Sequence, residues 1–454
     1  MLAFVCATAF AVVLNGTMLP VARPEIGEAL SLGRISLDWI IIGYFLVNGV
    51  SIPFFGRLAD LHGVARLYAL GLATFFLGSL FCILAPGFAV LMAGRLVQGA
   101  GAAAVVGLGP TAVSLVFPPE HRGRYLGVVG AAVGAGAAAG PVFGGAITDL
   151  FGWRALFAAG VLFGALAPLA FRMLPVGVRS PEGRLDLAGG LFFALTLGGA
   201  LLAMTLGAEN GWNDPIVLWS IAVTAAALAG FAYRQATVRV PFVPRALLSN
   251  RSYVWLCVAT LLLVGVIVAV EVAVPLTLAR LNGMEPTQIG LVLLPAALLT
   301  VVWGPVSGSI VDRFGVALPT ALGAAACVAG VVLLSGFGVG GSAWVTGAFV
   351  VVVGVGTTLA KIATSTGVSL AVSEENLPSG ISVNEMVWIS GISVGTALFS
   401  AVATARSGAT ESLNPFHAGA GVGYSDAYLA LAVPLILAAL TAAGLGRPRK
   451  SAKG

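Results

Sequence analysis

Fourteen apolar runs constrain this chain more than any other feature of its sequence. A helix of about 20 apolar residues crosses a bilayer. Hydrophobic residues make up 59% of the 454 residues and charged residues only 9%, a composition outside the range of soluble domains. The sequence therefore predicts an all-α polytopic membrane protein with fourteen transmembrane helices, at 2–20, 38–57, 66–85, 88–116, 123–147, 153–174, 187–207, 215–234, 252–278, 287–311, 318–337, 342–373, 379–403 and 425–445.

Basic residues gather on one side of these predicted helices. Of 23 Lys and Arg, sixteen fall on that side, five on the other, and two, Arg95 and Lys361, inside helices. Cytoplasmic loops are enriched in Lys and Arg, so we expect both termini in the cytoplasm, which suits an even number of spans. The first run begins almost at Met1 without a basic flank, which leaves open a start upstream.

An octet at Gly56–Gly63, G-R-L-A-D-L-H-G, returns at Gly308–Gly315 as G-S-I-V-D-R-F-G, with the two Asp residues 252 positions apart. Two six-helix halves would separate the octets by about 180–200 residues, at about 30 residues per helix and loop. The observed separation exceeds this expected one by about the length of two additional helices with their loops. We expect a six, two, six layout, typical of duplicated transporters: an N-terminal bundle 1–175, an insertion with linkers 176–250, a C-terminal bundle 251–446, and a basic tail 447–454 that touches anionic lipid.

Each octet is predicted to lie at the cytoplasmic gate. Gly56 lets a neighbouring helix approach closely, Gly63 permits a tight reversal, and Asp60 can accept hydrogen bonds from amides at a helix N-terminus or pair with an Arg. A single copy would more often be an ordinary turn, and its repetition argues against that. The predicted gate set also includes Arg66, Asp312 and Arg313.

The run 88–116 contains Arg95, and a guanidinium in hydrocarbon is costly. We expect Arg95 to face the bundle interior and to hold an acidic or carbonyl partner; snorkelling to the outer surface is the alternative.

The next run, 123–147, contains the string G-x-x-x-G-P-x-x-G-G, formed by Gly136, Gly140, Pro141, Gly144 and Gly145. Glycines three and four apart form a packing seam, and Pro141 removes a helical hydrogen bond. Packing alone would explain the glycines.

These three stretches resemble conserved motifs of the major facilitator superfamily, the last being the motif of its antiporters. The plan is similar to the fourteen-span drug–proton antiporter branch. The strings Gln98–Ala104, Ile310–Arg313 and Lys361 with Ser365-Thr366 resemble Gram-positive tetracycline–proton antiporters most closely. The resemblance implies the major facilitator fold and alternating access by rocking of two bundles.

The chain departs from this pattern at its acids. Asn15 stands where the fourteen-span branch has an acid, and the tetracycline pumps carry Glu where this chain has Gly16 and Ile392. Glu271, four residues before Pro275, and Glu385 are then the candidate proton carriers beside Arg95, because burial favours the protonated carboxyl group that a proton carrier needs. The alternative for Glu271 is an acid at the outer interface.

The predicted substrate cavity contains Asn15, Gln98, Lys361, Asn384 and Trp388. Lys361 could bind an anionic group or pair with Glu385. The chain has no Walker A string and no metal-ligand spacing, so we expect a transporter driven by the proton gradient, without a cofactor, and neither an enzyme nor a nucleic-acid binder.

We therefore expect a monomer in the bacterial cytoplasmic membrane that exports small amphipathic drug-like compounds in exchange for protons. Proton-coupled uptake of a metabolite on the same fold is one alternative. A transport-inactive sensor or assembly protein is the other.

Overall fold

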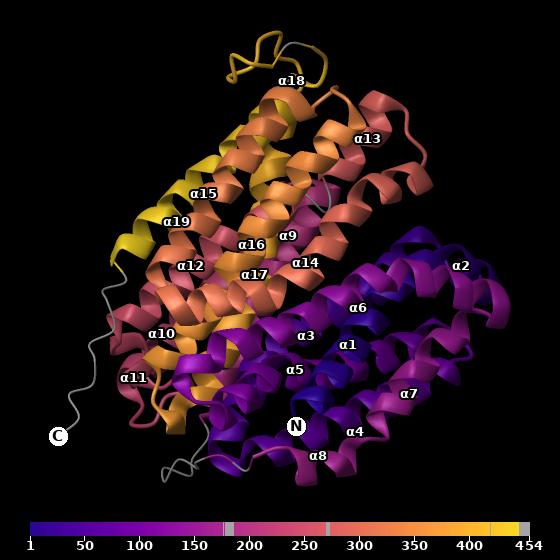
Figure 1. Cartoon of the computed structure of the whole chain (residues 1–454). Helices are drawn as coiled ribbons and strands as arrows, with labels where there is room; N and C mark the ends of the chain where they lie inside the picture. The colour runs from indigo at the N-terminus through magenta and orange to yellow at the C-terminus, as the bar shows by residue number, and fades with distance from the viewer. Residues whose placement is uncertain (176, 178–185, 269–272, 418, 445–454) are drawn as a thin grey trace. The chain divides into compact units, whose positions relative to one another are not determined.

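The computed structural model describes residues 1–454 apart from 176, 178–185, 269–272, 418 and 445–454, and helices make up all the regular structure in that part (Figure 1). The helices are α1 Leu2–Met18, α2 Arg23–Leu30, α3 Arg34–His62, α4 Val64–Ile83, α5 Phe88–Val116, α6 Arg122–Phe151, α7 Ala158–Gly164, α8 Ala167–Met173, α9 Leu187–Asn210, α10 Pro215–Thr237, α11 Arg245–Ser249, α12 Arg251–Val268, α13 Val274–Asn282, α14 Pro286–Phe314, α15 Ala317–Leu333, α16 Ala343–Ala371, α17 Leu377–Ala405, α18 Val422–Ala430 and α19 Ala432–Gly444.

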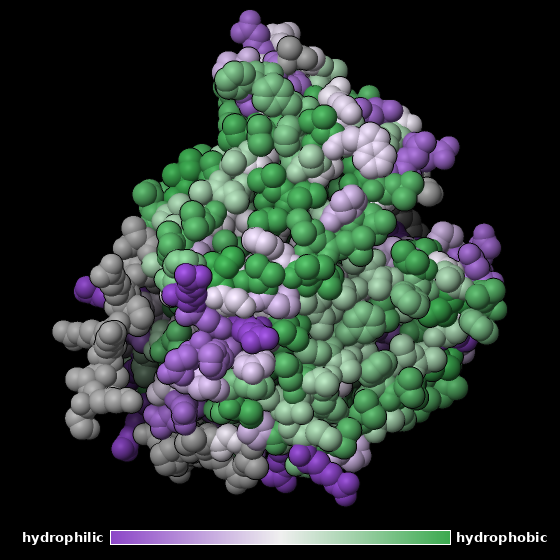
Figure 2. Space-filling model, viewed as in Figure 1, coloured by the Kyte–Doolittle hydropathy of each residue, from purple (hydrophilic) through white to green (hydrophobic). Residues whose placement is uncertain are grey.

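Twelve helical segments of the described chain are long and apolar enough to cross a membrane. They correspond to twelve of the fourteen predicted runs. The other two runs are also helical: α12 and α13 lie on either side of residues 269–272, and α17 is one helix of 29 residues. Apolar side chains dominate the face shown in Figure 2, as expected for a surface that meets lipid.

The predicted sixth helix, 153–174, is interrupted in the structure. It consists of a 3₁₀ turn at Trp153–Phe157, then α7, then α8 beginning at Ala167. Pro168 stands in the first turn of α8, where its missing N–H breaks no helical hydrogen bond. A proline ring clashes with the carbonyl four residues earlier in a continuous helix, so Pro168 accounts for the break after Gly164.

The chain groups into two compact units that do not coincide with simple halves. Unit 1 comprises Met1–Pro118, Val128–Leu247 and Val372–Met386, and unit 2 comprises Pro119–Gly127, Leu248–Ala371 and Val387–Gly454. The first residues of α6 therefore group with unit 2, and the first residues of α17 with unit 1. The helices α9 and α10, which the sequence predicts as an inserted pair, belong to unit 1.

A glycine contact repeats in the two units. A Cβ added to Gly71 of α4 would touch Ala104 and the Gly101 carbonyl of α5, and one added to Gly323 of α15 would touch Ala360 and the Gly356 carbonyl of α16. Gly71 and Gly323 each follow their octet Asp by eleven residues. Because small residues let helix backbones meet in lipid, the duplication extends from the octet into the packing of the next two helices.

Candidate functional site

The first octet joins α3 to the start of α17 within unit 1. The backbone N–H of Ser379 donates to Asp60 Oδ1 at 3.1 Å, and its hydroxyl donates to Oδ2. Arg57 Nη1 lies 3.3 Å from the same Oδ2, and both Arg57 and Asp60 are buried. Asp60 thus caps the first turn of α17, where helical N–H groups lack partners and the dipole favours an anion. A Cβ on Gly56 would collide with Ser382 and Pro378, so that glycine permits the approach.

The second octet makes the corresponding cap within unit 2. Asp312 of α14 accepts hydrogen bonds from the backbone N–H groups of Gly123 at 2.8 Å and Arg124 at 2.9 Å, in the first turn of α6. Gly63 and Gly315, which end the octets, have φ of 90° and 76°. In the same region Arg122 donates to the Ser369 carbonyl of α16 at 2.8 Å. Two copies of one sequence pattern therefore perform the same task, capping a helix from a distant part of the chain.

Arg66 and Arg313, which the sequence groups with the gate, are both exposed. The Arg313 guanidinium lies 5.2 Å from the ring centroid of Phe314. Arg66 lines a groove with α8 and makes no hydrogen bond or ion pair to the residues that the structure describes. The two Asp caps therefore form without either arginine.

Arg95 is fully buried in a polar cluster inside unit 1. Its Nη1 donates to Gln98 Oε1 at 2.5 Å and to Asn15 Oδ1 at 3.4 Å, and its Nε donates to the Ile40 carbonyl at 3.4 Å. The guanidinium stacks 4.0 Å from the centre of the Tyr44 ring. Arg95 thus has carbonyl-type partners and, within the described residues, no carboxylate, so its charge rests on dipoles and a π face.

Further hydrogen bonds hold the side chains of Gln98 and Asn15 in place beside Arg95. Gln98 Nε2 donates to Ser79 Oγ at 2.7 Å, and Asn15 Nδ2 donates to the Leu156 carbonyl at 3.0 Å. Nη2 of Arg95 is buried without a hydrogen-bond partner. The sequence identified Arg95, Asn15 and Gln98, but Tyr44 and Ser79 lie on other helices and carry no local signal of this role.

The antiporter-like string forms a seam between α6 and α1 in unit 1. An added Cβ on Gly136 would lie 2.7 Å from the Phe10 carbonyl oxygen, one on Gly140 would collide with Thr17, and one on Gly144 would lie 2.8 Å from the Met18 carbonyl oxygen. A Cβ added to Gly145 would lie 3.8 Å from Val21, an ordinary van der Waals distance. The helix α6 continues through Pro141 without a break. Three of the four glycines thus face α1.

Lys361 of α16 lies over the ring of Trp388 of α17 in unit 2, with Nζ 4.1 Å from the centroid. Both side chains are half-buried and lie ten or more residues from the ends of their helices. Asn384 and Glu385, one turn earlier on α17, are buried and make contacts of their own. Glu271, the other predicted proton carrier, falls outside the described residues.

A second polar cluster lies at the far end of α17 and was not identified from the sequence. Asp426 of α18 is buried and accepts hydrogen bonds from Arg406 Nε at 2.7 Å, the Leu413 N–H at 2.8 Å and the Ser412 hydroxyl at 2.9 Å. Asn414 Nδ2 donates to Ser335 Oγ at 3.0 Å. These bonds fasten the loop between α17 and α18 to the helices of unit 2.

The described residues contain no group of three or more His, Cys, Asp or Glu that could hold a metal ion. The constellations described above include helix caps, close-packed glycine seams and a single cation within a long apolar helix of each unit. This combination, repeated in two units of an all-helical membrane chain, defines the class of duplicated membrane transporters.

Comparison with known proteins identifies the family. The model of the Major Facilitator Superfamily matches residues 5–396, and the chain belongs to that superfamily. The resemblance of its motifs indicated this superfamily, and its apolar helices are those of a multi-pass membrane protein.

The chain is similar in sequence to named relatives and similar in structure to a solved protein. The chain is 32% identical to multidrug resistance protein Stp of Mycobacterium tuberculosis (strain CDC 1551 / Oshkosh) over 72% of its own length and 61% of Stp. It is 31% identical to riboflavin transporter RibZ of Clostridioides difficile (strain 630) over 69% of its length and 68% of RibZ. The crystal structure of the human organic anion transporter MFSD10 (TETRAN) superposes with a TM-score of 0.69 at 13% identity, covering 97% of this chain and 98% of that one, which shows the shared fold.

Proposed function

We propose that this transporter is a proton-coupled antiporter that exports amphipathic drug-like compounds by alternating access, with fourteen spans in a six, two, six layout. One observation carries the proposal: each unit holds one cation deep in an apolar helix, stacked on an aromatic ring, Arg95 on Tyr44 and Lys361 on Trp388. Charges at this depth are costly and are retained for transport. A ring beside a cation suits flat substrates with a polar group.

Export is favoured over uptake by one named relative, since Stp is described as a multidrug resistance protein. The glycine seam of α6 against α1 supports the same direction through its resemblance to the antiporter motif. RibZ, described as a riboflavin transporter, keeps uptake of a metabolite as the second candidate.

In the proposed cycle the two Asp caps open and close the cytoplasmic side. Asp60 and Asp312 bind helix N-termini when that side is closed, and Gly56 and Gly63 shape the first copy. Arg95 coordinates the proton step with Glu271 or Glu385. Asn15, Gln98 and Asn384 provide neutral polar contacts to the substrate, and Lys361 and Trp388 of unit 2 provide a cation and an aromatic ring. The protein works as a monomer in a bacterial cytoplasmic membrane with both termini inside.

Proton release from proteoliposomes tests the proposal. Reconstituted protein is challenged with Mg-tetracycline, ethidium, a quinolone, a macrolide and riboflavin while internal pH is recorded. Antiport predicts substrate-triggered proton release that is lost in Glu271→Gln or Glu385→Gln and kept in Glu120→Gln, which removes an exposed loop acid. Proton and substrate moving in the same direction would establish uptake instead. No flux with any compound would favour the sensor alternative.

A further inference from the structure

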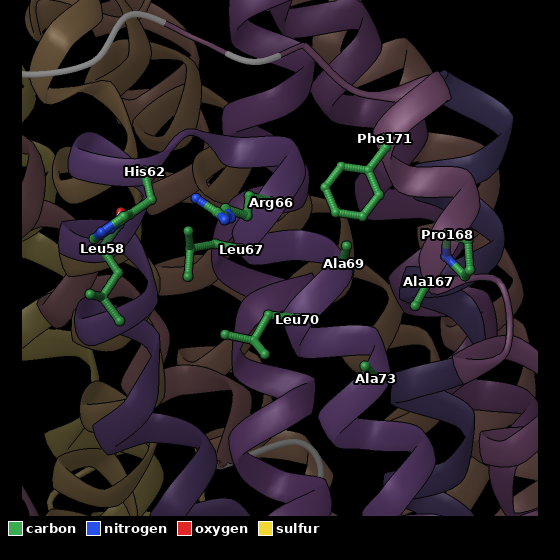
Figure 3. A pocket seen from close by; sticks show the side chains of 10 residues that line it. All are labelled: Leu58, His62, Arg66, Leu67, Ala69, Leu70, Ala73, Ala167, Pro168 and Phe171. Carbon is green, nitrogen blue, oxygen red and sulfur yellow. The ribbon is translucent and has the colours of Figure 1, made fainter.

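Unit 1 has a groove of about 550 Å³ between α3, α4 and α8, at the octet end of α3 (Figure 3). Its walls are apolar and include Ala69, Leu70, Ala73, Ala167, Pro168 and Phe171. Its two polar side chains, His62 and Arg66, are exposed. The groove exists because α8 starts anew after the break at Pro168 and because three lining positions are alanine.

The groove continues along α4 as a stripe of exposed apolar side chains, as expected for a surface that meets lipid. Leu70, Leu77 and Phe81 of α4 are all exposed, with spacings of seven and four residues that place them on one helix face. Arg66 lies one turn before Leu70 on that face. A cation therefore stands at the membrane-surface end of an apolar track, which matches a lipid with an anionic headgroup and an acyl chain.

The second repeat shows that this cation is not part of the duplicated architecture. Counting from the octet Asp, His62 corresponds to Phe314 and Arg66 to Leu318, and both of these are exposed apolar residues. The same helix position thus tolerates leucine in unit 2. Arg66 has no hydrogen-bonding or ionic partner in the described protein, and Nδ1 of His62 lies 3.2 Å from the carbonyl oxygen of Leu58 on its own helix.

We propose that this groove binds one anionic phospholipid, with the headgroup phosphate at Arg66 and His62 and an acyl chain along Leu70 and Ala73 to Phe171. Phe171 points from α8 back across the groove toward α4, where it would cover the chain (Figure 3). The lipid would bridge the turn after the first octet and the interrupted sixth span.

Native mass spectrometry of the delipidated full chain tests this proposal, with phosphatidylglycerol and phosphatidylcholine added at equal concentration. We expect one phosphatidylglycerol to be retained in preference to phosphatidylcholine. Arg66→Gln should weaken its binding about fivefold, the ratio that corresponds to about 1 kcal/mol for one basic residue near anionic lipid. Arg251→Gln, which removes an exposed arginine from unit 2, should leave the binding unchanged.

A second variant tests the acyl chain without changing the charge. Ala73→Leu fills the groove at a half-buried position, and it should reduce retention of phosphatidylglycerol while thermal denaturation shows an intact fold. Equal losses in Arg66→Gln and Arg251→Gln would show diffuse attraction and overturn the site. Retention in Ala73→Leu, or displacement of the lipid by glycerol 3-phosphate at matched concentration, would exclude an acyl chain in the groove.

Discussion

Asp60 on α3 caps α17 through Ser379, a residue 319 positions further along the chain: the Ser379 N–H donates to one carboxylate oxygen at 3.1 Å and its hydroxyl to the other. Asp312 repeats the arrangement with two backbone N–H groups of α6. The first cap is fully buried and includes Arg57, whereas Asp312 is only half-buried. The two caps therefore respond differently to substitution.

Asp60→Asn should destabilise the protein more than Ser379→Ala. The asparagine leaves buried Arg57 without its carboxylate, which costs about 3–5 kcal/mol in the free energy of unfolding. Ser379→Ala removes one hydroxyl and keeps the N–H bond, at a cost of about 1 kcal/mol. Denaturant unfolding of detergent-solubilised protein measures both. Equal losses would mean that the Arg57 pair contributes nothing.

Arg95→Lys should impair transport and lower stability although it keeps the charge. A lysine Nζ cannot reach Gln98, Asn15 and the Ile40 carbonyl together or stack flat on Tyr44. Loss of these charge-assisted hydrogen bonds should lower the free energy of unfolding by about 1.5–3 kcal/mol. Arg154→Lys is the control, because Arg154 sits at the start of the sixth span, outside the Arg95 cluster, and donates to the Ala85 carbonyl. Full activity of Arg95→Lys would show that the charge alone matters.

Gly136→Ala and Gly130→Ala should have opposite effects, although both lie on α6. The Gly136 methyl group would meet the Phe10 carbonyl oxygen, and such overpacking costs about 1–3 kcal/mol. Gly130 has open space around its Cβ position, so alanine there should gain up to about 1 kcal/mol of helix propensity. Thermal denaturation compares the pair, and a stabilised Gly136→Ala would contradict the seam.

Lys361 and Trp388 should be energetically coupled. A double-mutant cycle with Lys361→Met and Trp388→Leu is expected to give about 0.5–2 kcal/mol, the range for a cation over an aromatic ring. The free energies of unfolding of the four proteins in the cycle give the coupling energy. Comparing the transport of anionic and cationic substrates by Lys361→Met tests whether the charge of Lys361 contributes to substrate selection. Additive effects would show that the two side chains are merely neighbours.

Asp426→Asn should expose the loop between α17 and α18 to proteolysis. It removes the carboxylate that binds Arg406, Ser412 and Leu413, so local opening should become about tenfold or more populated. Limited proteolysis of intact protein measures the cleavage rate. Glu411→Gln is the matched control, because that exposed side chain makes no hydrogen bond to the described protein. Cleavage at an unchanged rate in Asp426→Asn would contradict this account.

Much of this fold was predictable because the bilayer demands long apolar helices and the octet recurs at a fixed place. Twelve predicted runs are membrane-competent helices, and the superfamily was recognised from the motifs. The predicted run 153–174 does not reveal the break before α8, because Pro168 lies inside an otherwise continuous apolar stretch. Pro141, also within a run, leaves α6 unbroken, so proline alone does not locate a break.

The candidate site was predictable only in part. The sequence predicts that Asp60 accepts hydrogen bonds at a helix N-terminus or pairs with an Arg. Hydropathy cannot say which helix start lies beside Asp60, so it does not identify Ser379. Arg95 was expected to find carbonyl or acidic partners, while Tyr44 and Ser79 depend on the rotation of neighbouring helices. A signal for Ser379 existed in Leu377-Pro378, a helix start whose first-turn amides need acceptors.

The loop between α17 and α18, which is held through Asp426, has a practical consequence for imaging. It follows the last turn of α17, a helix about 44 Å long at 1.5 Å per residue, so it lies at the opposite end of that helix from its first turn. Arg406, Ser412 and Asn414 hold this loop by hydrogen bonds, which makes the segment around them suitable as an epitope. An antibody fragment bound there would give a small membrane protein the fiducial mass that electron cryomicroscopy requires, while leaving the first turn of α17 untouched.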